Sequence, residues 1–176
     1  MANRVQTTNR INWAFFAAQV VIQALLVVLF TMLMPESDLT LVLVLAGGFY
    51  LAWSAFSKTL LFREHRQGVR LTLFERHDEA IKAFEQSYAF LDRSPWIDRL
   101  RWLVALDSSA IPYREMALCN IAYNYARKGD ARQAKVFYEQ ALAQFPNSEQ
   151  AKAGLKMIDD AVEEYRNQRS IQQDGQ

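Results

Sequence analysis

The chain has 176 residues, 51% of them apolar and 22% charged, and its formal net charge is +1 at pH 7. Nucleic-acid binding needs a concentrated positive face, so this balance of charge argues against a duplex-binding role and predicts no nucleic-acid partner. Cys119 is the only cysteine, which excludes an internal disulfide and is typical of a protein whose soluble part lies in a reducing compartment.

Two long uncharged segments lie early in the chain, at residues 11–34 and 39–56. As helices rising about 1.5 Å per residue, they would be about 36 and 27 Å long, close to a bilayer core of about 30 Å. The first segment ends in Pro35-Glu36 without the small-residue pattern of a cleaved signal peptide, so we expect it to be retained. The pattern predicts a transmembrane helical hairpin at residues 11–57, preceded by a tail at residues 1–10.

Positive charge flanks this hairpin on its outer ends only. Arg4 and Arg10 precede it, Lys58 and Arg63 follow it, and the connecting turn carries neither lysine nor arginine. Because these residues are enriched on the cytoplasmic side of membrane helices, both termini are predicted to be cytoplasmic. We expect an integral membrane protein with two spans in the bacterial inner (plasma) membrane, where the lipid bilayer is its surroundings.

Polar and small side chains within the two apolar segments indicate how the segments pack. In lipid, small residues allow close approach of backbones, and amide side chains form hydrogen bonds between helices. The predicted packing residues are Asn12, Gln19 and Gln23 on one face of the first segment, and Gly48, Ala52 and Ala55 on one face of the second. They serve either packing within the hairpin or contact with the transmembrane helix of a partner or a second copy.

The helical pattern continues beyond residue 57, because neither proline nor a turn cluster appears before His77-Asp78. The second membrane helix is therefore expected to run on into the next helix. Within residues 61–91, small and large side chains follow an order that recurs further along the chain, with Gly68, Ala80 and Phe84 at its main positions. This order predicts a first helical hairpin, with Glu75-Arg76 at its turn.

Ser94-Pro95 opens an insertion before the second copy of this pattern. Apolar and polar residues alternate with helical spacing at residues 95–106, which predicts a short amphipathic helix. Tryptophan enters the membrane interface readily, and arginine can remain at the level of the lipid phosphates. We expect the helix at the cytoplasmic membrane surface; the alternative is a spacer helix packed between the two hairpins. The proposed membrane-interface residues are Trp96, Arg99, Arg101 and Trp102.

Residues 115–148 contain the most regular pattern in the chain. Gly129 can take the left-handed conformation that ends one helix, Asp130 can cap the next, and Pro146 ends it. This order of small, large and turn residues resembles the tetratricopeptide repeat, and the resemblance implies a scaffold that binds other proteins in a groove, without chemistry of its own. The matching core positions are Leu118, Ile121, Ala122, Tyr125, Ala134, Tyr138, Ala141 and Leu142.

The resemblance also implies where a partner binds, since the first helix of each hairpin lines the inner face of such an array. Tyrosine and arginine are enriched at binding hot spots. The alternative is that these residues are solvated or packed within the array. The proposed partner-binding residues are His65, Val69, Asn120, Tyr123 and Arg127.

A further amphipathic helix is predicted at residues 149–166, where it would cap the array, and the polar residues 169–176 predict a flexible tail. The expected fold class is all-α: a two-helix transmembrane hairpin followed by a short tetratricopeptide-like helical repeat array with a capping helix. The helical domain covers residues 58–168. The capping helix would be buried through Leu155, Ile158, Ala161, Val162 and Tyr165.

Motifs that carry chemistry are missing from the sequence. It contains no phosphate loop, no GxSxG, no HExxH, no paired Cys-x-x-Cys and no dinucleotide-binding glycine pattern. His65 and His77 have no second cysteine or carboxylate cluster with which to form a metal site. We therefore predict no catalytic residues, no metal, no cofactor and no enzymatic activity.

Two functions compete on this evidence. The first is a membrane-anchored protein–protein interaction scaffold or adaptor, whose cytoplasmic groove holds a protein partner. The alternative is a structural or assembly subunit of a larger membrane protein complex, bound mainly through its transmembrane hairpin. Two hairpins and a cap fall short of the three or so repeats that usually bury a continuous core, so a homo-oligomer is a further option.

Overall fold

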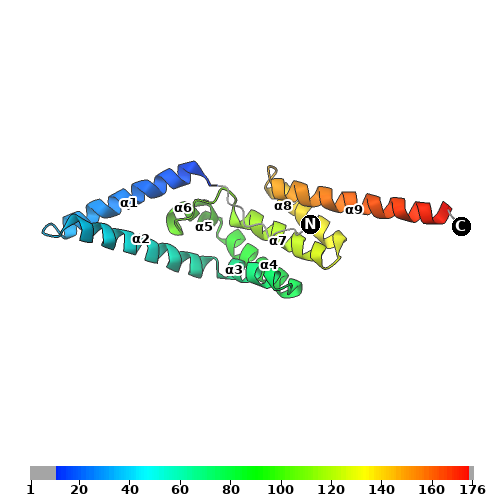
Figure 1. The fold of residues 1–176 in the computed structure, drawn as a ribbon, viewed down its shortest axis with the longest axis horizontal. Coiled ribbons are helices and arrows are strands. Elements are labelled where there is room, and N and C mark those ends of the chain that lie inside the picture. Colours follow the sequence, from blue (N-terminus) through cyan, green and yellow to red (C-terminus); the bar gives the residue numbers. More distant parts are fainter. Residues whose placement is uncertain (1–10, 175–176) are drawn as a thin grey trace. The chain divides into compact units, whose positions relative to one another are not determined.

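The computed structural model describes residues 11–174, with side-chain surroundings for residues 11–169. Within this range the chain forms nine helices and no strand, which confirms the all-helical class (Figure 1). The predicted tail at residues 1–10, with Arg4 and Arg10, lies outside the described residues. The described chain divides into two units, an N-terminal unit of residues 11–63 and 90–112 and a C-terminal unit of residues 64–89 and 113–174.

The N-terminal unit is built on the helices α1 (Trp13–Leu33) and α2 (Leu39–Leu61). Asn12 caps α1, since its side-chain oxygen accepts hydrogen bonds from the backbone N–H groups of Ala14 (3.1 Å) and Phe15 (3.3 Å). α1 ends shortly before Pro35, which cannot continue a helix. Both helices are long and apolar enough to cross a membrane, as the sequence predicts.

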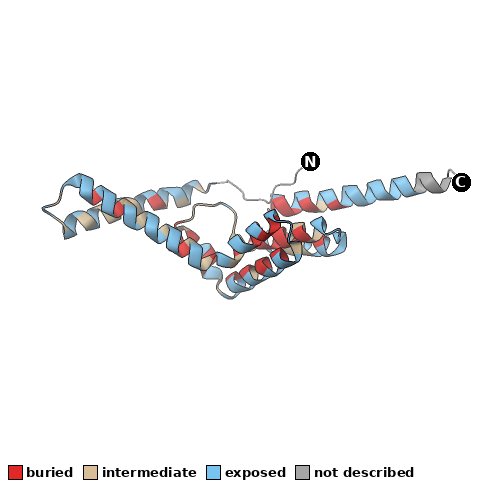
Figure 2. Ribbon diagram, turned by 60° about the horizontal axis from the view of Figure 1, so that its bottom comes forward, coloured by how far each residue is buried: buried red, intermediate tan, exposed pale blue. Residues whose placement is uncertain are grey.

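Helices α1 and α2 contact each other along a narrow face. On α2, Val42 and Ala46 are buried, and on α1 the amide side chain of Gln19 is buried. The rings of Phe30 and Phe49 lie 6.4 Å apart between centroids. Most of the remaining apolar surface of both helices is exposed, as Figure 2 shows, which is the distribution expected of helices surrounded by lipid.

One expectation about α2 is wrong. The predicted continuous helix is interrupted at Phe62, where α2 ends and α3 (Arg63–Leu73) begins. The backbone N–H of Phe62 still donates to the carbonyl of Lys58 at 3.2 Å, but its φ and ψ of -117° and 27° depart from the helix. Phe62 is only 1% exposed, so burial of a large side chain accompanies a break that neither glycine nor proline signals.

The insertion belongs to the N-terminal unit. It forms two short helices, α5 (Pro95–Arg99) and α6 (Arg101–Val104), where the sequence predicts one helix over residues 95–106. Behind α6 the chain returns to the start of α1, where the N–H of Asn12 donates to the carbonyl of Ser108 at 2.8 Å. The insertion therefore packs with the membrane-length helices, although the sequence-based boundaries group it with the helical domain.

The C-terminal unit contains two helical hairpins and a long final helix. Most of α3 and of α4 (His77–Arg93) form the first hairpin, and α7 (Tyr113–Arg127) with α8 (Ala131–Gln144) forms the second. Two apolar clusters fill the unit. One lies among α7, α8 and α9, and the other lies in the first hairpin and includes Ile121 of α7. α7 is buried on most of its circumference because it packs against α8 and α9 on one side and against the first hairpin on the other.

A buried polar network also joins the two hairpins. Asn124 on α7 is fully buried, and its amide nitrogen donates to the hydroxyl of Thr72 (3.0 Å) and to the carbonyl of Asn120 (2.8 Å). Its side-chain oxygen lies 2.8 Å from Nδ1 of His77. Because the amide has partners on both sides, burying it carries little of the usual penalty.

The turns of the two hairpins have the same hydrogen bonds. The N–H of Asp130 donates to the carbonyl of Tyr125 (2.9 Å), and the N–H of Arg76 donates to that of Leu71 (3.0 Å). Gly129 has a φ of 84°, as predicted for a helix end, and Asp130 caps α8 by accepting from the N–H of Gln133 at 3.0 Å. Glu75 holds the matching place in the first turn with a φ of 58°.

The final helix, α9 (Glu149–Asp174), is longer than predicted. Residues 169–174, expected in a flexible tail, are helical, and residues 175 and 176 lie outside the described residues. Ser148 caps the start of α9, since its hydroxyl accepts from the N–H of Ala151 at 3.3 Å. Ala151 and Ile158 are buried against the second hairpin, whereas every residue from 159 to 169 is exposed.

Candidate protein-binding groove

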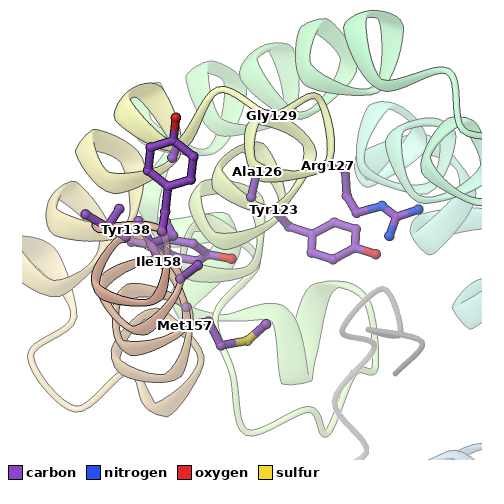
Figure 3. A pocket seen from close by; sticks show the side chains of 12 residues that line it. Tyr123, Ala126, Arg127, Gly129, Tyr138, Met157 and Ile158 are labelled. Atoms are coloured by element: carbon purple, nitrogen blue, oxygen red, sulfur yellow. The ribbon is translucent and has the colours of Figure 1, made fainter. Parts of the chain in front are cut away.

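A groove of about 450 Å³ lies in the C-terminal unit between α7, the start of α8 and α9 (Figure 3). Its surface is mostly apolar, because alanine, glycine and large hydrophobic side chains make up nearly all of it. Its size falls within the range of about 300–1,000 Å³ typical of ligand pockets. The lining residues are Tyr123, Ala126, Arg127, Gly129, Ala131, Tyr138, Gly154, Met157, Ile158, Ala161, Val162 and Tyr165.

Tyr138 and Gly154 fix the base of the groove. A Cβ placed on Gly154 would lie 2.2 Å from Cζ of Tyr138, so the ring lies directly on the backbone of α9. Burial raises the pKa of the Tyr138 hydroxyl above its ordinary value, so this group stays neutral. This contact holds α9 against α8 at the end where the groove begins.

The wall formed by α9 carries large apolar side chains that are exposed. Met157 is 53% exposed, Val162 39% and Tyr165 64%. The predicted capping helix therefore covers the second hairpin only with its first half. The apolar stripe continues along the second half of this helix, where no side chain of α7 or α8 covers Val162 or Tyr165 enough to bury it.

Charged groups lie at the edges of the groove. On α7, the guanidinium of Arg127 lies 3.6 Å from the carboxylate of Glu75, and both groups are largely exposed. On α9, Asp160 and Glu164 are exposed and share a helix face with Met157 and Ala161, because these positions are spaced by three and four residues. Exposed Lys156, one turn before Asp160, offsets part of the acidic charge on this edge of α9, and the positive charge of Arg127 is partly balanced by Glu75.

Only part of the proposed partner-binding set lines this groove. Tyr123 and Arg127 line the groove from α7, and Figure 3 shows both side chains pointing away from Tyr138 and Ile158. Val69 is half-buried and packs against the cluster around Phe84, and Asn120 is 3% exposed. His65 is also buried, with its ring edge-on to Phe84 and Tyr113. Residues 65, 69 and 120 therefore serve packing in this structure.

Sequence reasoning did not assign the α9 residues to a binding surface. The signal was present in the apolar stripe that runs as far as Tyr165, which is longer than one helical hairpin can cover. It predicted the helix, and its apolar residues were expected to be buried. The structure leaves Val162 and Tyr165 exposed beside Tyr123 and Arg127 in one groove.

The four proposed membrane-interface residues differ in exposure. Trp96 and Arg99 are exposed, whereas Trp102 is half-buried and stacks on Phe15 of α1 with 6.3 Å between ring centroids. Arg101 is buried and donates to the carbonyls of Asp98 and Ser109, each at 2.7 Å. The guanidinium of Arg101 thus ties the insertion together from within.

The proposed transmembrane packing residues also occupy different environments. Asn12 caps α1, Gln19 is buried, and Nε2 of Gln23 lies 3.9 Å from where a Cβ on Gly47 would be. The small residues of α2 are exposed, and a Cβ on Gly48 would meet nothing within 4 Å. Contact of that face with a partner helix stays a prediction. The exposed small residues of α2 are Gly48, Ala52 and Ala55.

Reactive groups are sparse in the part of the chain that the structure describes. It contains no cluster of three or more histidine, cysteine or acidic residues that could hold a metal ion. Burial raises the pKa of the Cys119 thiol to about 12, which keeps it protonated and unreactive at neutral pH.

No protein-family model matches the chain, and neither a curated protein nor a solved structure matches it. The resemblance to the tetratricopeptide repeat therefore depends on the pattern of residues alone. The structure contains helical hairpins where that pattern predicts them, while membership of the family stays a prediction.

Proposed function

We propose that this protein is a membrane-anchored protein–protein interaction scaffold. Its helices α1 and α2 anchor the chain in the bilayer, both termini lie in the cytoplasm, and the groove between α7 and α9 binds a protein partner in the manner of a tetratricopeptide repeat. The observation that carries this proposal is the exposed apolar wall of α9, where Val162 and Tyr165 face a groove of about 450 Å³. Exposed apolar surface bordered by charge is typical of interaction sites.

The chemistry of the groove favours an amphipathic helix as the bound segment. Apolar side chains of such a helix would fill the space between Tyr123, Met157 and Tyr165, in the way that helices bind apolar grooves in other proteins. Asp160 and Glu164 at the α9 edge favour a lysine or arginine beside those anchors, since complementary charge steers and orients binding. The partner is thus a protein with a basic amphipathic segment.

The assembly-subunit alternative is supported by a different observation. Gly48, Ala52 and Ala55 form an exposed small-residue face on α2, and such faces allow close helix packing in lipid. In that case the main contact is made by α2 within the membrane, and the groove contributes little. The two proposals therefore place the main contact in different units of the chain.

Photo-crosslinking in intact cells distinguishes them. A photoreactive phenylalanine analogue is placed at Tyr165 in the groove, at Gly48 on α2, or at Val136, an apolar residue of α8 that is 49% exposed and lies outside the groove. The scaffold proposal predicts a discrete crosslinked protein from position 165 and none from 136. That protein should contain a basic amphipathic segment at the crosslinked site.

Position 136 is the control against which capture from the groove is judged. Equal capture from positions 165 and 136 would indicate nonspecific contact and would contradict the scaffold proposal. Capture from position 48 alone would favour the assembly-subunit alternative instead.

A further inference from the structure

A second cavity lies in the N-terminal unit, among helices that the scaffold function uses only as an anchor. It measures about 440 Å³ and is an open cleft bordered by α1, α2 and the end of the insertion. Ile22 and Leu26 of α1 face Phe49 and Trp53 of α2, and Val104 and Leu106 close the third side. A space of this size accommodates a small molecule or part of a lipid.

The third side of the cavity is held in place independently of any ligand. Trp102 stacks on Phe15, and the guanidinium of Arg101 lies over the same ring at 5.3 Å from its centroid. The backbone hydrogen bond from Asn12 to Ser108 ties the insertion to the start of α1, and the two bonds donated by Arg101 to Asp98 and Ser109 hold the insertion itself together. The cavity is therefore a formed feature of the unit.

The lining determines the chemical class of the occupant. No charged residue contributes to it, and the hydroxyl of Tyr50 and the indole N–H of Trp53 are its only side-chain polar groups. A polar solute would lose hydrogen bonds to water on entering such a lining. A flexible hydrocarbon chain has no hydrogen bonds to water to lose, and it can follow an irregular apolar wall.

The position of the cavity along α1 identifies the source of that chain. At about 1.5 Å per residue, Ile22 and Leu26 lie about 14 and 20 Å from the start of a helix about 31 Å long. If α1 crosses the bilayer, the cavity lies at the depth of the lipid acyl chains. The surrounding membrane supplies such chains in large excess over any other apolar ligand.

We propose that this cavity binds one acyl chain of a membrane phospholipid against its apolar lining. The inference depends on the membrane anchorage of the proposed function, and it is independent of the groove. It assigns the insertion a role: α6 holds a structural lipid against the hairpin.

Native mass spectrometry of the full chain, purified in detergent and washed free of loose lipid, tests the proposal. Wild-type protein should retain one phospholipid per chain. Val104→Trp fills the cavity and should lower retention about tenfold or more, a change of about 1.4 kcal/mol in binding. Leu26→Phe fills it more gently and should act in the same direction. Leu25→Trp is the matched control, because Leu25 is 62% exposed beside Leu26, and it should retain the lipid.

Each other outcome has a defined meaning. Absence of lipid from the wild type, equal retention in the Val104 and Leu25 variants, or a protein in place of the lipid adduct would overturn the proposal. Alkaline extraction of membranes separates its failure from that of the anchor. A chain that stays in the membrane but carries no lipid refutes this inference alone, whereas a chain released by alkali refutes membrane anchorage as well.

Discussion

The two helical hairpins of the C-terminal unit have the same turn but different residues in it. In each, an N–H at the start of the second helix reaches back to a carbonyl in the last turn of the first, at 2.9 Å in one hairpin and 3.0 Å in the other. The second hairpin places Gly129 in the left-handed conformation, whereas the first places Glu75 there. The turn is thus specified by packing of the flanking helices, and glycine only lowers its cost.

The same comparison applies inside the hairpins. Gly68 in α3 lies against the ring of Phe84, and Ala122 holds the matching place in α7. Three residues before each of these, the first hairpin buries His65 and the second buries Cys119. The architecture tolerates these exchanges, but a titratable histidine and a strained turn should make the first hairpin the weaker one.

The largest expected effect is a loss of folding stability at acid pH, caused by the buried histidine of the first hairpin. Burial lowers the pKa of His65 from 6.5 to about 4, so between these pH values the unfolded chain binds a proton that the folded chain does not. Stability should therefore fall as the pH decreases through this window, by about 3 kcal/mol in total, with no further loss from this group below it. Chemical unfolding of the full chain in detergent, followed by helical circular dichroism, measures this.

A substitution isolates the contribution of this histidine from that of the carboxylates. His65→Phe keeps an aromatic ring beside Phe84 and Tyr113 but cannot bind a proton. The variant should lose much less stability than the wild type between neutral pH and pH 4. Parallel pH profiles for the two proteins would show that His65 is not the acid-sensitive group.

The second difference concerns close packing. An alanine Cβ at position 154 would lie 2.2 Å from the ring of Tyr138, whereas one at position 68 would lie 2.9 Å from the ring of Phe84. Gly154→Ala should therefore cost about 2 kcal/mol and Gly68→Ala about 1 kcal/mol, since overpacked cores must shift. Denaturant unfolding of both variants gives the comparison. A larger loss from Gly68→Ala would contradict this ranking.

The smallest expected effects concern the turns and have opposite signs. Glu75→Gly should stabilise the protein by about 1 kcal/mol by relieving a left-handed glutamate, and Gly129→Ala should destabilise it by about as much. A Cβ on Gly129 would meet nothing within 4 Å, so the backbone alone is tested there. Glu75→Ala removes the ion pair to Arg127 but keeps the strain, so it should bring no gain. Thermal melting temperatures of the three variants decide the matter.

Much of the fold could be predicted from local signals. Long uncharged segments mark α1 and α2, and Gly129-Asp130 marks the turn between α7 and α8, because a left-handed glycine and a capping aspartate act within a few residues. The first hairpin was also found, although its turn contains glutamate. There the spacing of Gly68 and Phe84 carried the prediction.

Features that depend on tertiary contacts could not be predicted in this way. The break at Phe62 has no local breaker, and the burial of Arg101 depends on carbonyls of Asp98 and Ser109 that only the folded insertion brings together. The groove was half predicted, through Tyr123 and Arg127. The wall formed by α9 was not predicted, because an apolar stripe indicates a buried face but does not show that Ile158 is buried while Val162 and Tyr165 are exposed.

The central claim is that the groove between α7 and α9 binds the partner, and one measurement tests it most directly. Ala161→Arg places a large cation within the groove, and Val136→Arg places the same side chain on the exposed face of α8. Both variants are expressed at equal level, and the protein captured by crosslinking at position 165 is quantified after co-purification in mild detergent. The account predicts at least about a tenfold loss of that protein with Ala161→Arg and none with Val136→Arg. Equal recovery with both variants, in folded and membrane-inserted protein, would contradict it.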